Sequence, residues 1–392
     1  ITYANTMGDD LKALDRVLKQ HFSGVFGGIH VLPFFPSSGD RGFAVIHYDI
    51  VDPAFGDWDD IDRLGEQYYL MADFMLNHVS IRCAEFQDYM QNGDNSPYKD
   101  MFIDWNKFWP NGEPTEAELD VMYRRKEKGP FFSFTRADGK TVNLWNTFFQ
   151  EQVDIDPYSE ATRDYYSRNL GLIAKHVPLI RFDAFAYASK IAGRRNFFNE
   201  PETWQLLERL RALADESGIS LLPEIHASYA EQTYKKIAQS GYLTYDFFLP
   251  GLLLDALETG SGNLICRWAE ELNQNGIRTV NMLGCHDGIP LLDLRGLVPE
   301  ERIEALIETV VSRGGYVKNL YGQKNAYYQV NATYFSALGE SEQRLLFCRA
   351  LQMFMPGIPQ VWYLDLFAGK NDHEAVLRAG AGGHKEINRT NL

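Results

Sequence analysis

Eight short apolar runs divide the chain, and each has the composition of a buried β-strand. The runs lie at residues 1–4, 28–35, 69–76, 178–182, 220–225, 245–249, 279–283 and 359–363. Amphipathic segments with helical periodicity lie between many of them, at residues 11–22, 158–176, 202–217 and 231–239. Nearly continuous apolar strands that alternate with helices are typical of a parallel sheet buried on both faces. Eight such units predict an α/β fold, the (β/α)8 or TIM barrel.

Two stretches interrupt this alternation. Residues 79–155 follow the third predicted strand and are rich in aromatic and turn-forming residues, so we expect an inserted domain B there. Residues 288–340 follow the seventh strand and contain a helical segment at 300–312 and then an aromatic loop. The predicted organisation is therefore a barrel over 1–78, domain B over 79–155, barrel over 156–287, a second insertion carrying an acceptor loop over 288–340, and the last part of the barrel over 341–392.

Composition excludes several classes of partner. The formal net charge of −15 disfavours nucleic acid, because phosphate backbones require a basic surface. No C-x-x-C spacing joins Cys83, Cys266, Cys285 and Cys348, so we expect reduced core thiols and neither a zinc site nor a disulfide framework. No apolar run reaches the length of about 20 residues that a transmembrane helix needs. We expect a cytoplasmic protein with small-molecule substrates, no membrane partner, no metal and no cofactor; a homodimer is an open alternative.

Charged and imidazole side chains follow five of the predicted strands. The chain places Asp40 after the second strand, Asp73, Asn77 and His78 at the third, Arg181 and Asp183 at the fourth, Glu224 and His226 at the fifth, and His286 and Asp287 at the seventh. In a TIM barrel the C-terminal ends of the strands converge on one mouth, where active sites lie. A packing core would exclude so many charged groups unless they were paired, so we interpret these ends as a functional mouth.

Three carboxylates at one mouth fit a particular chemistry. One can act as nucleophile, one as general acid and base, and a third can stabilise developing positive charge, as retaining glycosyl transfer requires. Arg181 stands two residues before Asp183 on a strand, so both face the same side and the cation keeps the carboxylate ionised. A structural Arg–Asp pair is the simpler alternative. A metal-dependent hydrolase is another, because Asp, Glu and His also ligate Mg²⁺ and Zn²⁺.

Four separated segments resemble the motifs of glycoside hydrolase family 13, the alpha-amylase superfamily. They are Asp-Phe-Met-Leu-Asn-His at 73–78, Arg-Phe-Asp-Ala at 181–184, Glu-Ile-His at 224–226 and His-Asp at 286–287, in the family's order. The resemblance implies that Asp183 is the nucleophile, Glu224 the acid–base and Asp287 the transition-state stabiliser. It also implies ligands of the glucosyl unit in the donor subsite, namely His78, Arg181 and His286.

Further stretches make the whole chain similar to the sucrose phosphorylase subgroup of that family. They lie at residues 1–4, 30–36, 42–43, 152–156, 328–334, 357–361 and 387–389. Members release α-glucose 1-phosphate with retention, because phosphate replaces water as the second nucleophile. The substrate-binding residues that this resemblance adds are Asp40 and Arg389 at the far side of glucose, Phe43 at its cationic face, and Gln152. The basic groups proposed for phosphate are Arg124, Arg125, Lys126 and His226.

The family normally continues past Arg389 into a small β-domain, whereas the sequence here ends at Leu392, so we expect that domain to be missing from it. The segment around the nucleophile also departs from the subgroup. It reads Arg-Phe-Asp-Ala-Phe-Ala-Tyr, whereas sucrose phosphorylases typically read Arg-Leu-Asp-Ala-Val-Gly-Tyr.

The acceptor side departs further. Ala326 stands where sucrose phosphorylases carry an acidic residue that contacts fructose. Its loss removes charge-assisted hydrogen bonds of about 1.5–3 kcal/mol, so fructose is not expected to be the best acceptor. Tyr187 and Gln329 remain, and Tyr327 and Tyr328 narrow the site towards a small polyol.

This pattern looks closest to the glucosylglycerol phosphorylases. It predicts the reversible conversion of 2-O-α-D-glucosylglycerol and phosphate into α-D-glucose 1-phosphate and glycerol. Alternatives with other acceptors are a sucrose 6′-phosphate phosphorylase and a sucrose phosphorylase. A hydrolase of the same family and a non-catalytic carbohydrate-binding barrel are the remaining alternatives.

Overall fold

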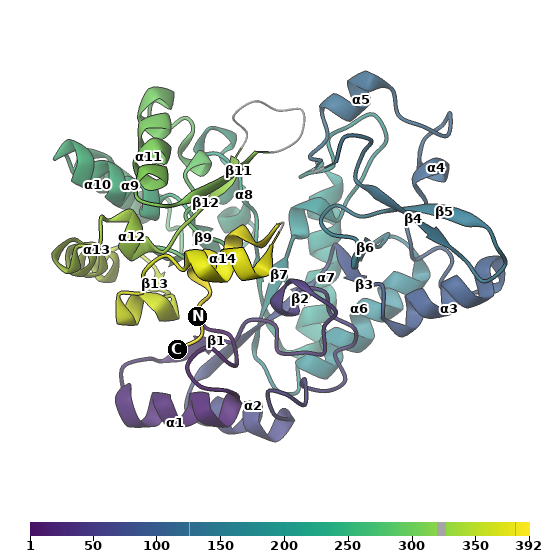
Figure 1. Ribbon diagram of the computed structural model, residues 1–392, viewed down its shortest axis with the longest axis horizontal. Coiled ribbons are helices and arrows are strands. Elements are labelled where there is room, and N and C mark those ends of the chain that lie inside the picture. Colours follow the sequence, from purple (N-terminus) through teal and green to yellow (C-terminus); the bar gives the residue numbers. More distant parts are fainter. Residues whose placement is uncertain (125, 320–326, 381) are drawn as a thin grey trace. The chain divides into compact units, whose positions relative to one another are not determined.

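The computed structural model describes residues 1–124, 126–319, 327–380 and 382–392, without the side chains at 318, 319, 327 and 328 (Figure 1). The chain divides into two compact units. The N-terminal unit is Tyr3–Glu224, and the C-terminal unit contains Ile1–Thr2, Ile225–Asn319 and the described residues from 327 onwards. In the described part of the chain, no helix has the length and the apolar character that a membrane span requires.

A four-stranded parallel sheet lies at the centre of the N-terminal unit. Its strands, in spatial order, are β1 (Gly28–His30), β2 (Tyr69–Met75), β7 (Leu179–Asp183) and β8 (Ser220–Pro223). These strands correspond to four of the predicted apolar runs; β1, β2 and β8 are shorter than their runs, and β7 is shifted by one residue. The register pairs Asp73 with Arg181, which brings the polar ends of β2 and β7 together.

Four amphipathic helices belong to this unit. They are α1 (Leu11–His21), α2 (Trp58–Gly65), α6 (Glu160–Ile173) and α7 (Glu202–Ser217), and α7 matches its predicted segment. Side-chain oxygens of Asp10, Asp57 and Ser159 cap the first three, accepting backbone N–H groups that would otherwise lack a partner. Buried aromatic rings fill the interior against the sheet, among them Tyr48, Phe74, Tyr165, Tyr166 and Phe182.

The segment after β2 contains its own small elements. Strand β3 (His78–Ser80) pairs antiparallel with β6 (Gln152–Asp154), and β4 (Phe131–Thr135) forms a hairpin with β5 (Thr141–Trp145) (Figure 1). The helices are α3 (Ala84–Asn92), α4 (Trp105–Phe108) and α5 (Glu116–Asp120). A separate cluster of buried residues joins α4, α5, β4 and β5, because Leu119 and Phe131 pack against its members Trp105, Trp109, Met122 and Trp145. The bounds of domain B stay a prediction.

The C-terminal unit has a three-stranded parallel sheet. Its strands, in spatial order, are β9 (Thr244–Asp246), β10 (Thr279–Asn281) and β13 (Ile358–Pro359). A two-stranded antiparallel ribbon consists of β11 (Tyr316–Asn319) and β12 (Tyr327–Asn331). The helices are α8 (Thr233–Gln239), α9 (Leu249–Thr259), α10 (Asn263–Gln274), α11 (Glu300–Ser312), α12 (Tyr334–Ala337), α13 (Glu342–Phe354) and α14 (His373–Ala379). Leucines on α9, α10 and α11 form a buried core with Trp268.

Short 3-10 helices complete the described structure at Asp40–Gly42, Gly93–Asn95, Phe185–Tyr187, Tyr229–Glu231, Leu292–Leu294, Tyr363–Phe367 and Gly383–Asn388. The predicted strand at residues 1–4 is not a regular strand. The amino group of Ile1 donates to the Val361 carbonyl at 2.8 Å, and Tyr363 N–H donates to the Ile1 carbonyl at 3.1 Å. The first residues therefore extend the edge of the C-terminal unit by single backbone bonds instead of a ladder.

Candidate active site

Three carboxylates of the N-terminal unit contact the guanidinium of Arg181. Its Nη1 donates to Asp183 Oδ1 at 2.9 Å and also contacts Asp73 Oδ1, while its Nη2 lies 2.5 Å from Glu224 Oε1. Asp73 comes from β2, Asp183 from β7, and Glu224 directly follows β8, so neighbouring strands deliver all of them. Arg181 thus holds Asp183 and Glu224 on the two terminal nitrogens of one guanidinium.

The backbone turns sharply where β7 ends. Ala184 has a φ of 52°, in the left-handed region that non-glycine residues rarely adopt. The turn ends the strand and aims the Ala184 N–H at Glu224 Oε2, at 3.4 Å. Asp183 is the most exposed of the three carboxylates, at 13% against 8% for Glu224 and none for Asp73. Of the three carboxylates in contact with Arg181, Asp183 is therefore the most accessible to solvent.

Residues that the sequence assigned to a donor subsite also lie together in this unit. His78 Nε2 lies 3.0 Å from the Phe43 carbonyl, and Gln152 Nε2 donates to the same carbonyl at 3.2 Å and to Asp40 Oδ2 at 3.3 Å. In the antiparallel pairing of β3 with β6, His78 lies opposite Asp154 and Gln152 lies opposite Ser80. Burial lowers the pKa of His78. The two side chains hold the segment that carries Asp40 and Phe43.

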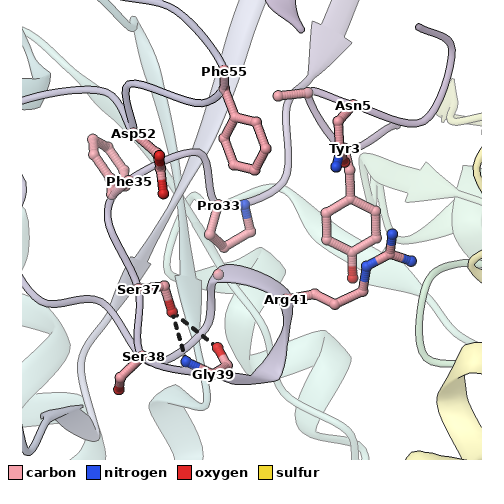
Figure 2. A pocket seen from close by; sticks show the side chains of 12 residues that line it. Tyr3, Asn5, Pro33, Phe35, Ser37, Ser38, Gly39, Arg41, Asp52 and Phe55 are labelled. Carbon is pink, nitrogen blue, oxygen red and sulfur yellow. Dashed lines mark hydrogen bonds between the residues drawn. The ribbon is translucent and has the colours of Figure 1, made fainter. Parts of the chain in front are cut away.

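That segment is a tight loop with three consecutive left-handed residues. Asp40, Arg41 and Gly42 have φ values of 49°, 48° and 107°. A Cβ at Gly42 would lie 2.5 Å from the Pro33 carbonyl, so only glycine fits there. Figure 2 shows the hydrogen bonds between Ser37 and Gly39 that tighten the loop. The Arg41 guanidinium lies 4.9 Å from the centre of the Tyr3 ring, beside a cavity of about 360 Å³.

Tyr187 lies in the 3-10 helix that follows the turn at Ala184. Its ring is buried and packs edge-on against the rings of Tyr123, Phe148 and Phe197, with centre distances of 5.1, 5.3 and 4.9 Å. Edge-to-face packing of this kind restricts the orientation of the ring. The acceptor-side tyrosine predicted from the sequence is therefore held in an aromatic cluster.

The buried Lys190, which was not predicted from the sequence as a site residue, binds the segment that contains Tyr187. Lys190 Nζ lies 2.8 Å from Asp154 Oδ2 and donates to Asn77 Oδ1 and to the Tyr187 carbonyl, both at 2.8 Å. Its side chain and that of Asp154 are almost completely buried. A lysine soon after a strand end that carries Arg and Asp is the sequence signal, but only the fold shows its partners.

Asp287 lies among cations in the C-terminal unit. Lys385 Nζ is 2.5 Å from Asp287 Oδ1, Arg389 Nη2 is 3.3 Å from the same oxygen, and His286 Nε2 is 3.6 Å from Oδ2. Although burial favours the neutral acid, His286, Lys385 and Arg389 hold the pKa of Asp287 well below its usual range. The sequence assigned His286 and Arg389 to the site and missed Lys385, which stands four residues before Arg389.

His226 and Gln329 meet in the same unit. The His226 ring stacks on Phe247 at a centre distance of 3.8 Å, and its Nδ1 lies 3.3 Å from Asp293 Oδ1. Gln329 Nε2, on β12, lies 3.2 Å from His226 Nε2. Two residues along the same strand, Asn331 donates to the Asp287 carbonyl at 2.7 Å. Strand β12 thus connects Gln329, predicted for the acceptor, with the backbone of Asp287.

The basic residues suggested for phosphate have local partners. Arg124 Nη1 donates to the Glu127 carbonyl at 2.6 Å and its Nη2 lies 3.2 Å from Asp120. Lys126 donates to the Phe131 carbonyl at 2.7 Å, and burial lowers its pKa to about 8. Arg125 and Ala326 and the side chains of Tyr327 and Tyr328 lie outside the described residues. Within the described ranges, no group of three or more His, Cys, Asp or Glu is arranged to hold a metal ion.

The chain is similar to known carbohydrate-active proteins. The alpha-amylase catalytic-domain family model matches residues 24–287. The sucrose 6(F)-phosphate phosphorylase of Ilumatobacter coccineus is 44% identical, in an alignment that covers this whole chain and 81% of that protein. The glucosylglycerol phosphorylase of Marinobacter adhaerens is 36% identical over 99% of this chain and 80% of its own length.

A solved phosphorylase structure is also similar to this chain. It is a sucrose 6F-phosphate phosphorylase from Thermoanaerobacter thermosaccharolyticum, with a TM-score of 0.94 and 39% sequence identity. The match covers 100% of this chain and 80% of that one.

Proposed function

Since the chain belongs to the alpha-amylase family, glycoside hydrolase family 13, and within it to the retaining phosphorylases, we propose that it transfers α-glucosyl groups between glycerol and phosphate. The substrate pair in this proposal is 2-O-α-D-glucosylglycerol and phosphate, and the products are α-D-glucose 1-phosphate and glycerol. The family and the structural likeness also confirm the TIM barrel that the eight apolar runs predicted.

In the proposed reaction the Asp183 carboxylate attacks the anomeric carbon while Glu224 donates a proton to the glycosidic oxygen. The bond between the anomeric carbon and the glycosidic oxygen breaks, and glycerol leaves. The glucosyl group remains bound to Asp183 as an ester. Phosphate then attacks the same carbon, transfers a proton to Glu224, and releases Asp183. Two inversions give net retention. The contact of Arg181 with Asp183 supports the assignment of the nucleophile, because a neighbouring cation favours the ionised carboxylate.

Asp287 is proposed to stabilise the positive charge of the oxocarbenium-like transition state. Its depressed pKa supports this role, because only the ionised carboxylate can stabilise a cation. The proposed ligands of the glucosyl unit are Asp40, Phe43, His78, Gln152, Arg181, His286 and Arg389. For phosphate we propose His226 together with the basic residues near Arg124.

The observation that carries the choice of acceptor is Ala326, which leaves the acceptor loop without a carboxylate. A hydroxyl-rich acceptor such as fructose loses charge-assisted hydrogen bonds there. Tyr187, packed among three aromatic rings, and Gln329, close to His226, remain as proposed acceptor contacts. Tyr328 is proposed to add a further aromatic face. Such a site suits a three-carbon polyol better than a ketohexose.

An acceptor panel tests the proposal. The enzyme is mixed with α-glucose 1-phosphate and, in separate reactions, glycerol, fructose, fructose 6-phosphate, glycerate or water. We expect phosphate release to be fastest with glycerol. Fastest release with fructose 6-phosphate would refute the assignment, and release that needs no acceptor would indicate a hydrolase.

Ala326→Asp is the matched variant for the acceptor argument. Restoring the carboxylate should shift the ratio of kcat/KM for fructose over glycerol upwards by about 10-fold or more, the equivalent of the lost hydrogen bonds. If the ratio does not change, the loop that contains Ala326 does not determine the choice of acceptor. The assignment as a phosphorylase would be unaffected.

A sucrose 6′-phosphate phosphorylase is the second candidate. The observation in its favour is the similarity, over the whole of this chain, to two proteins of that name, at 44% and 39% identity. The same panel separates the two candidates. We further propose that the enzyme needs no metal or cofactor, acts on small molecules alone and works in the cytoplasm.

A further inference from the structure

We propose that His30 is a positioning residue for glucosyl transfer, which acts through Asp73 to hold Arg181 against the nucleophile. The inference rests on the proposed function of the Arg181 cluster. His30 does not contact any of the three proposed catalytic carboxylates in a described hydrogen bond or ion pair; Asp73 and Arg181 lie between them.

The connection crosses three neighbouring strands. His30, the last residue of β1, places its Nε2 2.7 Å from Asp73 Oδ2 on β2. The other oxygen of Asp73 contacts Arg181 Nη1 on β7, and the same Nη1 donates to Asp183 at 2.9 Å. The side chains of His30, Asp73 and Arg181 are exposed by at most 3%, so water does not compete for these contacts.

A histidine is an unexpected residue at this position. Ile29, Val31 and Leu32 around it are buried and apolar, and the Nδ1 of His30 has no hydrogen-bond partner among the described residues. Burying a polar atom without a partner costs free energy that a leucine would avoid. Residues that destabilise a core are expected mainly at positions where function requires them. The requirement here is the bond to Asp73.

The chemistry of the ring fixes the direction of that bond. Burial lowers the pKa of His30, which favours the neutral ring with a single N–H. The Asp73 carboxylate only accepts, so this proton belongs on Nε2, and Nδ1 keeps its lone pair. His30 therefore donates to one oxygen of Asp73 while Arg181 donates to the other.

The consequence reaches the nucleophile. With both oxygens engaged, Asp73 cannot rotate, and Arg181 Nη1 is kept in line with Asp183. Without His30, Asp73 can turn and draw Nη1 away from Asp183. Misplacing a reacting group by about 1 Å costs up to about 100-fold in rate.

His30→Leu and His30→Gln test the inference. Leucine removes the donor, whereas the glutamine side-chain amide puts a donor at the same reach as Nε2. The substrate is α-glucosyl fluoride, whose leaving group needs no protonation by Glu224, so its rate reports on the nucleophile. For His30→Leu we expect kcat to fall about 10- to 100-fold, with KM changed by less than about threefold. For His30→Gln we expect most of the kcat to return.

Controls separate the positioning role from a structural one. His176, whose ring pairs with Asp62 near the surface at 2.7 Å, provides the matched variant His176→Leu, which should keep the wild-type kcat. The inference falls if His30→Leu keeps more than half of the wild-type kcat. It also falls if His30→Gln is as slow as His30→Leu while both retain the wild-type melting temperature. Should His30→Leu not fold, His30→Asn takes its place, because its shorter amide does not reach Asp73.

The fluoride assay also distinguishes this inference from the proposed function. Wild-type turnover of α-glucosyl fluoride depends on the glucosyl-enzyme and not on the choice of natural acceptor. If the wild type fails to turn over this substrate, the proposed function and the inference fall together. If the wild type turns over α-glucosyl fluoride and His30→Leu has the same kcat, only the role of His30 is wrong.

Discussion

Arg181 is a single buried cation in contact with three carboxylates, two of them proposed to carry the chemistry. Buried charges are tolerated when they are paired, and removing one member leaves its partners uncompensated. Arg181 cannot lose its proton in a protein, so the charge it supplies does not vary with pH. A lysine would not replace it. The planar guanidinium donates from two terminal nitrogens to neighbouring carboxylates, whereas the ammonium of lysine has a single nitrogen.

Asp183→Ala should abolish transfer without unfolding the protein. The nucleophile is lost, so we expect kcat for phosphate release to fall by more than about 1000-fold. Arg181 keeps Asp73 and Glu224 as partners, so the melting temperature should change little. Rates with α-glucose 1-phosphate and glycerol, measured beside a thermal melt, check both parts. Retained activity in a folded variant would contradict the assignment of the nucleophile.

Asp287 should contribute stability that depends on pH. Its pKa in the folded protein lies well below the value of about 3.9 expected when unfolded, so ionisation favours the fold. The contribution is complete above the unfolded pKa and is lost as the pH falls from about 4 towards the folded pKa. Denaturant unfolding of the wild type and Asp287→Asn should therefore differ by a constant amount between about pH 5 and 8. That difference should shrink below about pH 4; a constant difference down to pH 3 would contradict the prediction.

At the scale of elements, apolar composition predicted which segments form strands, but it did not predict the residues at which the strands end. The apolar runs predicted seven strands that the structure contains, because a strand buried on both faces needs apolar side chains throughout. Except for β7, the runs were longer than the strands. Strand β7 stops at Asp183 because Ala184 adopts a left-handed conformation, which no composition rule predicts. Helices α7 and α11 match their predicted segments, since periodicity specifies helices well.

The turn after β7 depends on Lys190, which joins it to β6 and to Asn77. Lys190→Met should lower the free energy of unfolding by about 3–5 kcal/mol, because Asp154 would remain buried without its cation. Lys370→Met is the matched control, since Lys370 forms an ion pair with Glu340 in which both side chains are exposed. The control should cost less than about 1 kcal/mol. Equal losses in the two variants, measured by urea unfolding, would contradict the argument.

At the scale of the whole molecule, the net charge of −15 implies mutual repulsion among surface carboxylates. Raising monovalent salt from about 10 mM to about 300 mM shortens the Debye length from about 30 Å to less than 10 Å, so the melting temperature should rise. The rise should be smaller near pH 5, where protonation of carboxylates reduces the charge. A melting temperature that falls with salt at pH 7.5 would contradict this expectation.

The sequence alone determined the kind of fold and the kind of chemistry. Apolar periodicity records the local environment of each segment, and it predicted the barrel; the motifs around Asp183, Glu224 and Asp287 indicated glycosyl transfer. Only the tertiary structure decided which side chains meet. His30 contacts Asp73 across 43 residues of sequence, and Asp73 contacts Arg181 across 108. Such contacts follow from the order and register of the strands, which depend on all segments together and leave no trace in any one of them.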